Sequence, residues 1–239
     1  VARVGGKPRR EGDALMLLVE DETLRPDVSG ALYWPREETL IVADLHLEKG
    51  SAFAARGQFL PPYDTAATLR RLNEACARLS PRRVIALGDS FHGRAAEERL
   101  SAPDHATLAR RIAAQEWVWV LGNHDPQPPK SLGGLVAEEI AIGALTFRHE
   151  PIEAPASGEI AGHLHPVASI RARGRRLRRR CFATDGARLV MPAFGAYAGG
   201  LDVLDAAFAP VFRGGFDVWM MGQAGVYRFA HAHLVPDAA

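Results

Sequence analysis

Side chains that commonly bind metal ions recur at five places along the 239-residue chain, each just after a short apolar run. They are Asp44 and His46, Asp89 with His92, Asn123 with His124 and Asp125, His149, and His163 with His165. Oxygen and imidazole ligands without thiolates suit manganese, iron(II) or zinc rather than a structural zinc knot. The set is too large for one ion but fits two ions that share a bridging carboxylate, an arrangement that serves in-line displacement at phosphorus. The sequence therefore predicts a dinuclear metal site for phosphate-ester chemistry.

Taken singly, these motifs also have ordinary structural explanations. His149 alone is most often an exposed or hydrogen-bonded histidine, and Asp89 alone could belong to a turn or a helix cap. Residues 123–125 could form a turn, and His163 and His165 could simply share one face of a strand. Five such motifs, all at strand ends and all of ligand-type residues, occur together by coincidence much less often than any one of them alone. The pattern as a whole therefore favours a shared site.

The elements that must position these residues alternate between strand and helix in the first half of the chain. Apolar runs at 40–43, 84–87 and 117–121 predict buried strands, and helices are expected over 64–79 and 103–115. Strand–helix alternation is typical of a parallel sheet with helical crossovers. In such a sheet ligands bind at the carboxyl ends of the strands, where the first three motifs lie.

After Pro129 the pattern changes to short strands with tight turns. Hairpins are predicted over 138–149, around Gly143, and over 167–184, around Gly174. Further short strands are expected at 14–19, 31–34, 159–163, 189–191, 201–204 and 226–230. We therefore expect one α/β domain with two sheets over residues 14–239, preceded by a loose basic arm at 1–13.

The charge of the chain is distributed unevenly. Residues 171–180 contain seven arginines and no acid, although the net charge of the whole chain is only +1. A basic segment on an otherwise acidic protein indicates a polyanionic partner, and a solvated hairpin tip is the alternative.

Composition excludes several other classes of protein. Cys76 and Cys181 provide neither a disulfide framework nor a Cys-x-x-Cys motif. No apolar run is long enough to cross a bilayer, and the basic N-terminus lacks the apolar segment of a signal peptide. We expect a cytoplasmic protein without a membrane partner.

The combined motifs resemble the complete signature of the calcineurin-like metallophosphoesterases. They are Asp44-x-His46, Gly88-Asp89, Gly122-Asn123-His124-Asp125, His149 and Gly162-His163-x-His165. The resemblance implies a four-layer α/β/β/α sandwich with two mixed sheets, whose metal site lies at the sheet edges.

The same resemblance assigns roles to these residues. It implies that Asp44, His46 and His165 bind one metal, that Asn123, His149 and His163 bind the other, and that Asp89 bridges them. A hydroxide that bridges the metals would attack phosphorus in line. His124 would face the scissile phosphate and assist the leaving oxygen, so that His124, Asn123 and Asp89 form the catalytic set.

His92 departs from the phosphatase pattern. Phosphomonoesterases of this superfamily usually have an aspartate three residues after the bridging one, whereas Gly88-Asp89-Ser90-Phe91-His92 resembles the DNA-repair nuclease branch. An imidazole in that place should leave His124 less cationic, which weakens a monoesterase interpretation. His92 and Asp125 are expected beside the ligands rather than among them.

A closer similarity covers roughly residues 40–205. The segments 44–53, 56–57 and 192–203 resemble the bacterial ligase-associated DNA-damage-response endonucleases (PdeM-like metallophosphoesterases). This resemblance implies manganese-dependent cleavage of DNA phosphodiesters in DNA repair and a functional association with an ATP-dependent DNA ligase and an Lhr-type helicase. Iron or zinc are the alternative metals. The candidate nucleic-acid contacts are Arg173, Arg175, Arg176 and Arg178.

Two other functions stay open from the sequence. One is a phosphatase or phosphodiesterase for nucleotides or other small phosphoesters. The other is a non-catalytic scaffold, which the complete ligand set disfavours.

Overall fold

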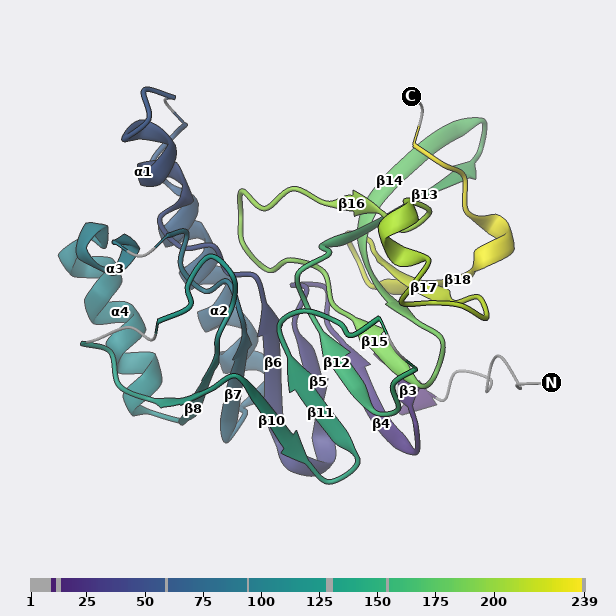
Figure 1. Ribbon diagram of the computed structural model, residues 1–239, viewed down its shortest axis with the longest axis horizontal. Helices are drawn as coiled ribbons and strands as arrows, with labels where there is room; N and C mark the ends of the chain where they lie inside the picture. The colour runs from purple at the N-terminus through teal and green to yellow at the C-terminus, as the bar shows by residue number, and fades with distance from the viewer. Residues whose placement is uncertain are drawn as a thin grey trace.

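Two stacked β-sheets form the body of the protein, with helices on the outer face of one of them (Figure 1). The computed structural model describes residues 10–11, 14–58, 60–93, 95–127, 131–153 and 155–237. This arrangement confirms the predicted α/β sandwich with two mixed sheets.

The first sheet has seven strands and carries the first three motifs. In spatial order they are β3 (Leu17–Val19), β4 (Glu22–Pro26), β5 (Leu32–Trp34), β6 (Thr39–Ala43), β7 (Arg83–Leu87), β8 (Glu116–Val120) and β9 (Leu135–Ala137). Strands β6 to β9 are parallel, as predicted for β6, β7 and β8. The carboxyl ends of these strands therefore meet at one edge of the sheet, and the loops that follow β6, β7 and β8 lie side by side.

Helices α2 (Asp64–Leu79) and α4 (Ala102–Ala113) cover the outer face of this sheet. Both were expected from the sequence, although α4 ends two residues earlier than predicted. It begins after Ser101, whose hydroxyl accepts a hydrogen bond from Asp104 N at 3.2 Å and caps the helix. Two short helices, α1 (Lys49–Ala54) and α3 (Ala96–Arg99), lie near the end of α2 that starts at Asp64 (top left of Figure 1).

The second sheet contains the two predicted hairpins. Its order is β10 (Glu139–Ile142), β11 (Leu145–Arg148), β12 (Glu159–Ala161), β15 (Arg188–Val190), β14 (Arg175–Thr184), β13 (Pro166–Ala172) and β16 (Leu201–Asp202). Strand β17 (Asp217–Met221) pairs with β14 and with β18 (Val226–Ala230). Because β11, β12 and β15 run parallel, His149 and the 163–165 segment leave the sheet at the same edge.

Strands β4, β9 and β17 were not predicted from the sequence. Strand β4 ends in Pro26 and mixes charged with apolar residues, and β9 is only three residues long and largely exposed. Strand β17 is buried on both faces, so its residues show no alternation, and it pairs with β14, where Phe182 is the register partner of Trp219. Each of these strands owes its existence to a neighbouring strand more than to its own residue pattern.

Three apolar layers hold the sandwich together. The first lies between the helices and the first sheet, and the second lies between the two sheets, where the Trp34 and Phe147 ring centroids are 6.1 Å apart. The third covers the outer face of the second sheet, where Phe208, Phe212 and Phe216 pack from the segment that contains the 3-10 helix η2 (Ala206–Phe208). In the described residues, this outer layer is built of a 3-10 turn and loops rather than α-helices.

The N-terminal region is described only in part. Of the predicted arm at 1–13, residues 1–9 and 12–13 lie outside the described residues, and β1 (Arg10–Glu11) pairs with β2 (Ala14–Leu15). None of the helices in the described ranges combines the length and apolar character needed to span a lipid bilayer.

A buried ion pair joins adjacent strands of the second sheet. Glu159 on β12 and Arg188 on β15 are direct register partners, each only 2% exposed, with Arg188 Nη1 3.4 Å from Glu159 Oε2. Glu159 Oε1 also accepts a hydrogen bond from Ile152 N at 3.1 Å. Burial raises the pKa of Glu159, so its charged form depends on these partners.

We expect Glu159→Ala to lower the free energy of unfolding by about 3–5 kcal/mol, because it leaves a buried guanidinium without that carboxylate. The matched control is Glu139→Ala, which removes the exposed partner of Arg148 and should cost less than about 1 kcal/mol. Urea titration of both variants measures the difference. Equal losses in the two variants would refute a stabilising role for the buried pair.

Candidate active site

The sequence-predicted ligands converge where five strands end. Asp44 directly follows β6, Asp89 follows β7 by two residues, and Asn123 follows β8 by three. His149 directly follows β11, and His163 and His165 lie between β12 and β13. The structure thus brings side chains from both sheets to one edge of the sandwich.

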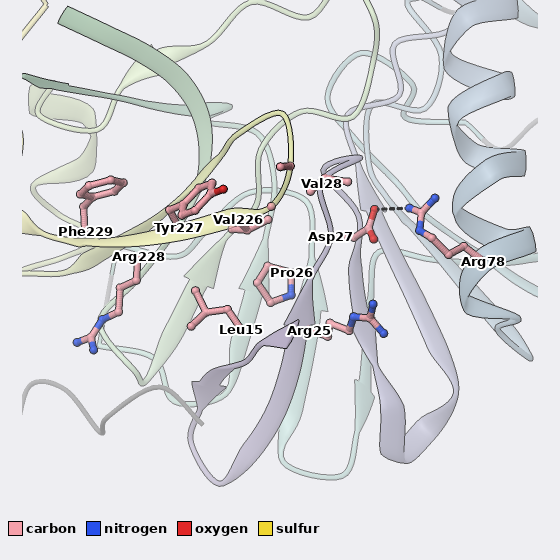
Figure 2. A pocket seen from close by; sticks show the side chains of 12 residues that line it. Leu15, Arg25, Pro26, Asp27, Val28, Arg78, Val226, Tyr227, Arg228 and Phe229 are labelled. Carbon is pink, nitrogen blue, oxygen red and sulfur yellow. Dashed lines mark hydrogen bonds and ion pairs between the residues drawn. The ribbon is translucent and has the colours of Figure 1, made fainter. Parts of the chain in front are cut away.

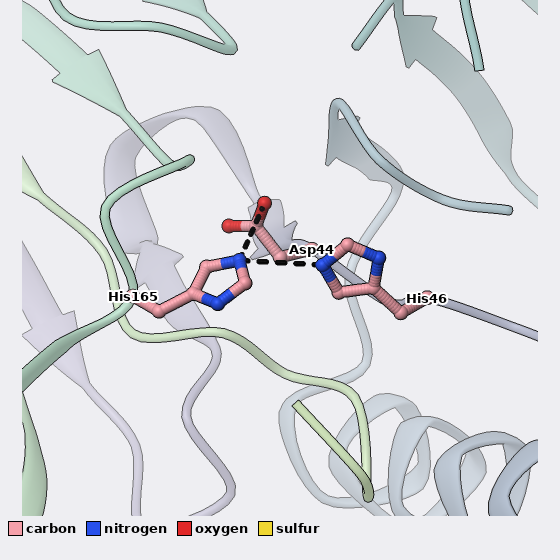
Figure 3. Close-up of side chains that lie close together, drawn as sticks. All are labelled: Asp44, His46 and His165. Carbon is pink, nitrogen blue, oxygen red and sulfur yellow. Dashed lines mark hydrogen bonds and ion pairs between the residues drawn. The ribbon is translucent and has the colours of Figure 1, made fainter. Parts of the chain in front are cut away.

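Asp44, His46 and His165 form one tight group (Figure 3). The Nε2 atoms of the two histidines are 3.3 Å apart, and His165 Nε2 is 3.1 Å from Asp44 Oδ1. One ligand atom from each residue lies within 4.8 Å of the others. Burial, together with the nearby His165 and Lys49 charges, lowers the pKa of His46 to about 2. The ring is therefore neutral and has a lone pair for a cation.

A second group is centred on His149. Its Nε2 atom lies 2.9 Å from Asn123 Oδ1, 3.2 Å from His163 Nδ1 and 3.5 Å from Asp89 Oδ1. Its other ring nitrogen lies 3.3 Å from Leu87 O, which can accept a hydrogen bond only if Nδ1 carries the proton. That tautomer leaves the Nε2 lone pair directed at the other ligand atoms.

The chemistry of these donors fits two divalent cations. Asp44 and Asp89 are 0% and 2% exposed, and no lysine or arginine of the described residues forms an ion pair with either. Two buried carboxylates without cationic partners are unfavourable unless metal ions neutralise them. Asp44 lies in both ligand groups, and Asp89 lies between His149 and His124.

The loops that carry the ligands have a strained backbone. Asp44, His46, Asp89, His163 and His165 all have positive φ angles, between 43° and 67°. Residues with a Cβ adopt this left-handed region only at an energetic cost, so the surrounding structure must hold them there. Hydrogen bonds between the loops do so: Asp44 N donates to Gly88 O, and His46 N donates to Asp89 O.

Two motif glycines leave room for the ligands. A Cβ at Gly122 would lie 2.2 Å from Asp89 N, and a Cβ at Gly88 would lie 2.2 Å from His149 Nδ1. Gly88 also has a φ of 71°. A larger residue at either position would therefore displace a ligand or its backbone.

Asp125 ties two of the ligand loops together and does not reach the metal-binding groups. Its Oδ2 accepts hydrogen bonds from Ser90 N at 2.7 Å and Phe91 N at 3.1 Å, and its Oδ1 accepts one from Gly122 N at 3.1 Å. Burial and the nearby Asp89 raise the pKa of Asp125 to about 7, against the effect of these donors. Asp125 thus joins the loops that follow β7 and β8, beside the predicted ligands.

His124 lies at the exposed mouth of the site. Its side chain is 47% exposed, and its Nε2 is 4.0 Å from Asp89 Oδ2. Its backbone N–H donates to Asp89 Oδ1 at 2.8 Å, which fixes the residue next to the metal ligands. The main chain of His124 is thus fixed beside the ligands, while its ring stays accessible to a substrate.

His92 contacts both a ligand and His124. Its ring stacks on the His124 ring with centroids 5.0 Å apart, and its Nδ1 is 3.4 Å from His46 Nδ1. Burial and the neighbouring His124 and Lys49 charges lower the pKa of His92 to about 4, so that it is neutral. The neighbour of His124 at this position is therefore an uncharged ring in place of a carboxylate.

The arginine-rich hairpin divides into an inner and an outer part. Arg180 lies at the site end of β14 and donates to the carbonyls of Ala193, Gly195 and Ala198. Burial lowers the pKa of Arg180 to about 10, and its hydrogen bonds to three carbonyls make its role structural.

The outer part holds the candidate nucleic-acid contacts. Arg176 and Arg178 pair with Asp237 of the C-terminal segment, whereas Arg173 and Arg175 flank the turn at the tip. At about 3.3 Å per residue, the tip lies roughly 16 Å beyond Arg180. In Figure 1 this hairpin projects at the upper right, away from α1.

Of two further supports of the site, sequence reasoning did not anticipate the first. Arg99 donates to His92 O at 3.2 Å and to Ser51 Oγ at 2.9 Å, and it belongs to a short helix that has no clear sequence pattern. Gly195 N donates to Asp44 O at 3.0 Å, so the 195–200 segment closes on the first ligand loop. The family resemblance over 192–203 had already singled out this segment, whose small residues allow the close approach.

A hollow of about 760 Å³ lies elsewhere, between the β4–β5 turn and the β17–β18 hairpin (Figure 2). Arg25, Val28 and Tyr227 line it, and the ion pair between Asp27 and Arg78 crosses its rim at 2.7 Å. None of the predicted ligands lines this hollow, so it is separate from the site.

Comparisons with known proteins agree with this geometry. The profile of the calcineurin-like phosphoesterases matches residues 38–183. Pseudomonas putida nuclease MPE has 30% identity and a TM-score of 0.69, and the match covers 90% of this chain and 98% of that one. Escherichia coli Yfce, a phosphoesterase, has 15% identity and a TM-score of 0.42, with 80% and 98% covered. No curated protein matched. This chain belongs to the calcineurin-like phosphoesterases and is a metal-dependent hydrolase.

Proposed function

We propose that this protein is a dinuclear, manganese-dependent phosphodiesterase that cleaves DNA as an endonuclease. The observation that carries the proposal is the convergence of seven nitrogen and oxygen ligands beside the exposed His124. The similarity to a nuclease at 30% identity over 90% of the chain supports a nucleic-acid substrate.

The residues divide naturally between two metals. Asp44, His46 and His165 would hold one ion; Asn123, His149 and His163 would hold the other; Asp89 would bridge them. When bound, two such ions supply Lewis-acid stabilisation of phosphoryl oxygens and a water of lowered pKa. A ligand set of imidazoles, carboxylates and one amide oxygen accepts manganese, which is our choice, as well as iron or zinc.

His124 would act on the substrate directly. Because its ring is exposed and its backbone is held to Asp89, it can face the scissile phosphate while the ligands stay buried. It would donate a hydrogen bond or a proton to the leaving oxygen. The neutral His92 stacked on it supports a diester substrate, which carries one negative charge less than a monoester.

A role in DNA repair, in association with an ATP-dependent DNA ligase and an Lhr-type helicase, is part of the proposal. Its support is the extended sequence similarity over residues 40–205, including the segment 192–203, whose Gly195 reaches Asp44. A pull-down of the tagged protein from its own cells, probed for the ligase and the helicase, tests this part.

A small phosphoester is the second candidate substrate. The observation in its favour is that Arg176 and Arg178, which were expected to contact DNA, are paired with Asp237 within the chain. These arginines are therefore not freely available to a DNA backbone unless the C-terminal segment moves.

Metal dependence is the first test. We expect metal-stripped protein to be inactive and manganese to restore cleavage of both closed circular DNA and bis-p-nitrophenyl phosphate. Asp89→Ala should abolish both activities and lower the bound manganese, because it removes the bridging carboxylate. Asp21→Ala, at an exposed turn, is the control. Cleavage of the small diester without cleavage of DNA would favour the second candidate, a small phosphoester substrate.

The role of His124 is tested separately from metal binding. We expect His124→Ala to lower kcat by about 10²–10⁴-fold, because it removes a general acid, while the metal content stays unchanged. His105→Ala serves as the control, since that histidine lies on α4 and contacts Ser131. Kinetics and elemental analysis on the same samples give the answer. A parallel loss of metal and activity would show that His124 acts through metal binding and not as the general acid.

The outer arginines are tested by substituting serine at Arg175, Arg176, Arg178 and Arg179, while the structural Arg180 is kept. If they hold the DNA backbone, cleavage of DNA should fall at least tenfold and its salt dependence should weaken, because each lost phosphate contact lowers the salt slope by about 0.7–0.9. Arg110→Ser on α4 is the control. Unchanged DNA cleavage would show that this hairpin is only a solvated tip.

A further inference from the structure

Lys49 lies beside the candidate active site and is the one lysine among the described residues. It is the first residue of α1 and follows the ligand His46 by three positions. Because α1 packs against His92 through Phe53, and His92 stacks on His124, this helix lies next to the candidate active site. The proposed mechanism does not use this residue.

The ammonium of Lys49 is half-buried and has no direct partner. Within the described ranges it forms no hydrogen bond and no ion pair. Asp64 acts on it electrostatically, but the Oδ2 atom of that carboxylate accepts a hydrogen bond from Gly50 N at 2.9 Å. Burial lowers the pKa of Lys49, which is the expected result of desolvating a charge without pairing it. A cation held in this way beside a reaction centre is well placed for an anionic ligand.

The surroundings of Lys49 form a basic wall on the α1 side of the site. Phe53 of α1 packs its ring 6.0 Å from the His92 ring. Arg99 ties α1 to the His92 loop through Ser51 Oγ and His92 O. The exposed Arg56, just after α1, also acts on His92 electrostatically. Phe53 and Arg99 hold this wall in position against the ring that stacks on His124.

This wall is a different surface from the arginine-rich hairpin. In Figure 1, α1 lies at the upper left and the β13–β14 hairpin at the upper right. Unlike Arg176 and Arg178, which pair with Asp237, Lys49 has no acidic partner at ion-pair distance among the described residues. A cation without an ion-pair partner is therefore available to a phosphate on the α1 side as well.

We propose that Lys49 at the start of α1, with Arg56 just after the end of this helix, binds the phosphate next to the scissile one and so guides a nucleic-acid strand across α1. The inference rests on the proposed function and deepens it, because a polynucleotide carries a further phosphodiester beside the scissile one. A small diester such as bis-p-nitrophenyl phosphate offers no group for this contact. Lys49 thus contributes to the preference for a nucleic acid over a small phosphoester.

The test compares Lys49→Met, which keeps the aliphatic stem, with Lys49→Arg, which keeps the charge. With the manganese enzyme and a short single-stranded oligonucleotide, we expect Lys49→Met to raise KM at least tenfold while the loss on bis-p-nitrophenyl phosphate stays below threefold. Lys49→Arg should recover most of the oligonucleotide activity. Arg110→Met on α4 is the control for a general loss of positive charge.

Binding gives a second readout that does not depend on cleavage. The Kd of a fluorescein-labelled oligonucleotide is measured by anisotropy at several salt concentrations, in a His124→Ala background loaded with manganese. Loss of one phosphate contact on a single strand should reduce the slope of log Kd against log salt by about 0.7 in Lys49→Met. Lys49→Arg should keep the parental slope.

The outcomes separate this inference from the proposed function. An unchanged Kd and slope in Lys49→Met, or equal losses on both substrates that Lys49→Arg does not recover, would overturn the phosphate contact. If the parent enzyme binds the oligonucleotide through Lys49 but hydrolyses only the small diester, the endonuclease function fails and the contact stands. If the parent enzyme does not bind the oligonucleotide, both fail.

Discussion

The burial of two carboxylates at one edge of the sandwich is the constraint on which the structure depends. Asp44 and Asp89 are almost completely inaccessible and have imidazole and amide ligands around them but no lysine or arginine partner in the described residues. Such a group of lone pairs is stable only with cations at its centre. The parallel strands β6, β7 and β8 end at the same edge as β11 and β12, and this brings the ligand loops together.

Precision at the site comes from the backbone. The ligand residues adopt left-handed conformations that are unfavourable in isolation, and interloop hydrogen bonds compensate for this strain. Asp125 joins the Ser90 and Gly122 loops, while Arg180 holds the 193–198 carbonyls. Residues that do not touch the substrate thus determine where the ligand atoms lie.

The order of strands and helices in the first half of the chain could be predicted from residue patterns. Helix α2 and the strands β6, β7 and β8 have strong local signals, as do both hairpins. Strands β4, β9 and β17 escaped prediction because each is short and is stabilised by pairing with its neighbours. The outer layer of the second sheet likewise depends on the packing of Phe208, Phe212 and Phe216, which no local period indicates.

The sequence by itself determined the identity and grouping of the ligand-type residues, because ligand chemistry is a property of residue type and each group directly follows a strand. Only the tertiary structure decided which of the basic side chains around the site are paired within the chain and which are available to a substrate. It turned Arg180 inward as a support, paired Arg176 and Arg178 with Asp237, and left Lys49 at the start of α1 without an ion-pair partner among the described residues. The physical reason is that the availability of a charge depends on its partners, and these come from parts of the chain far apart in sequence.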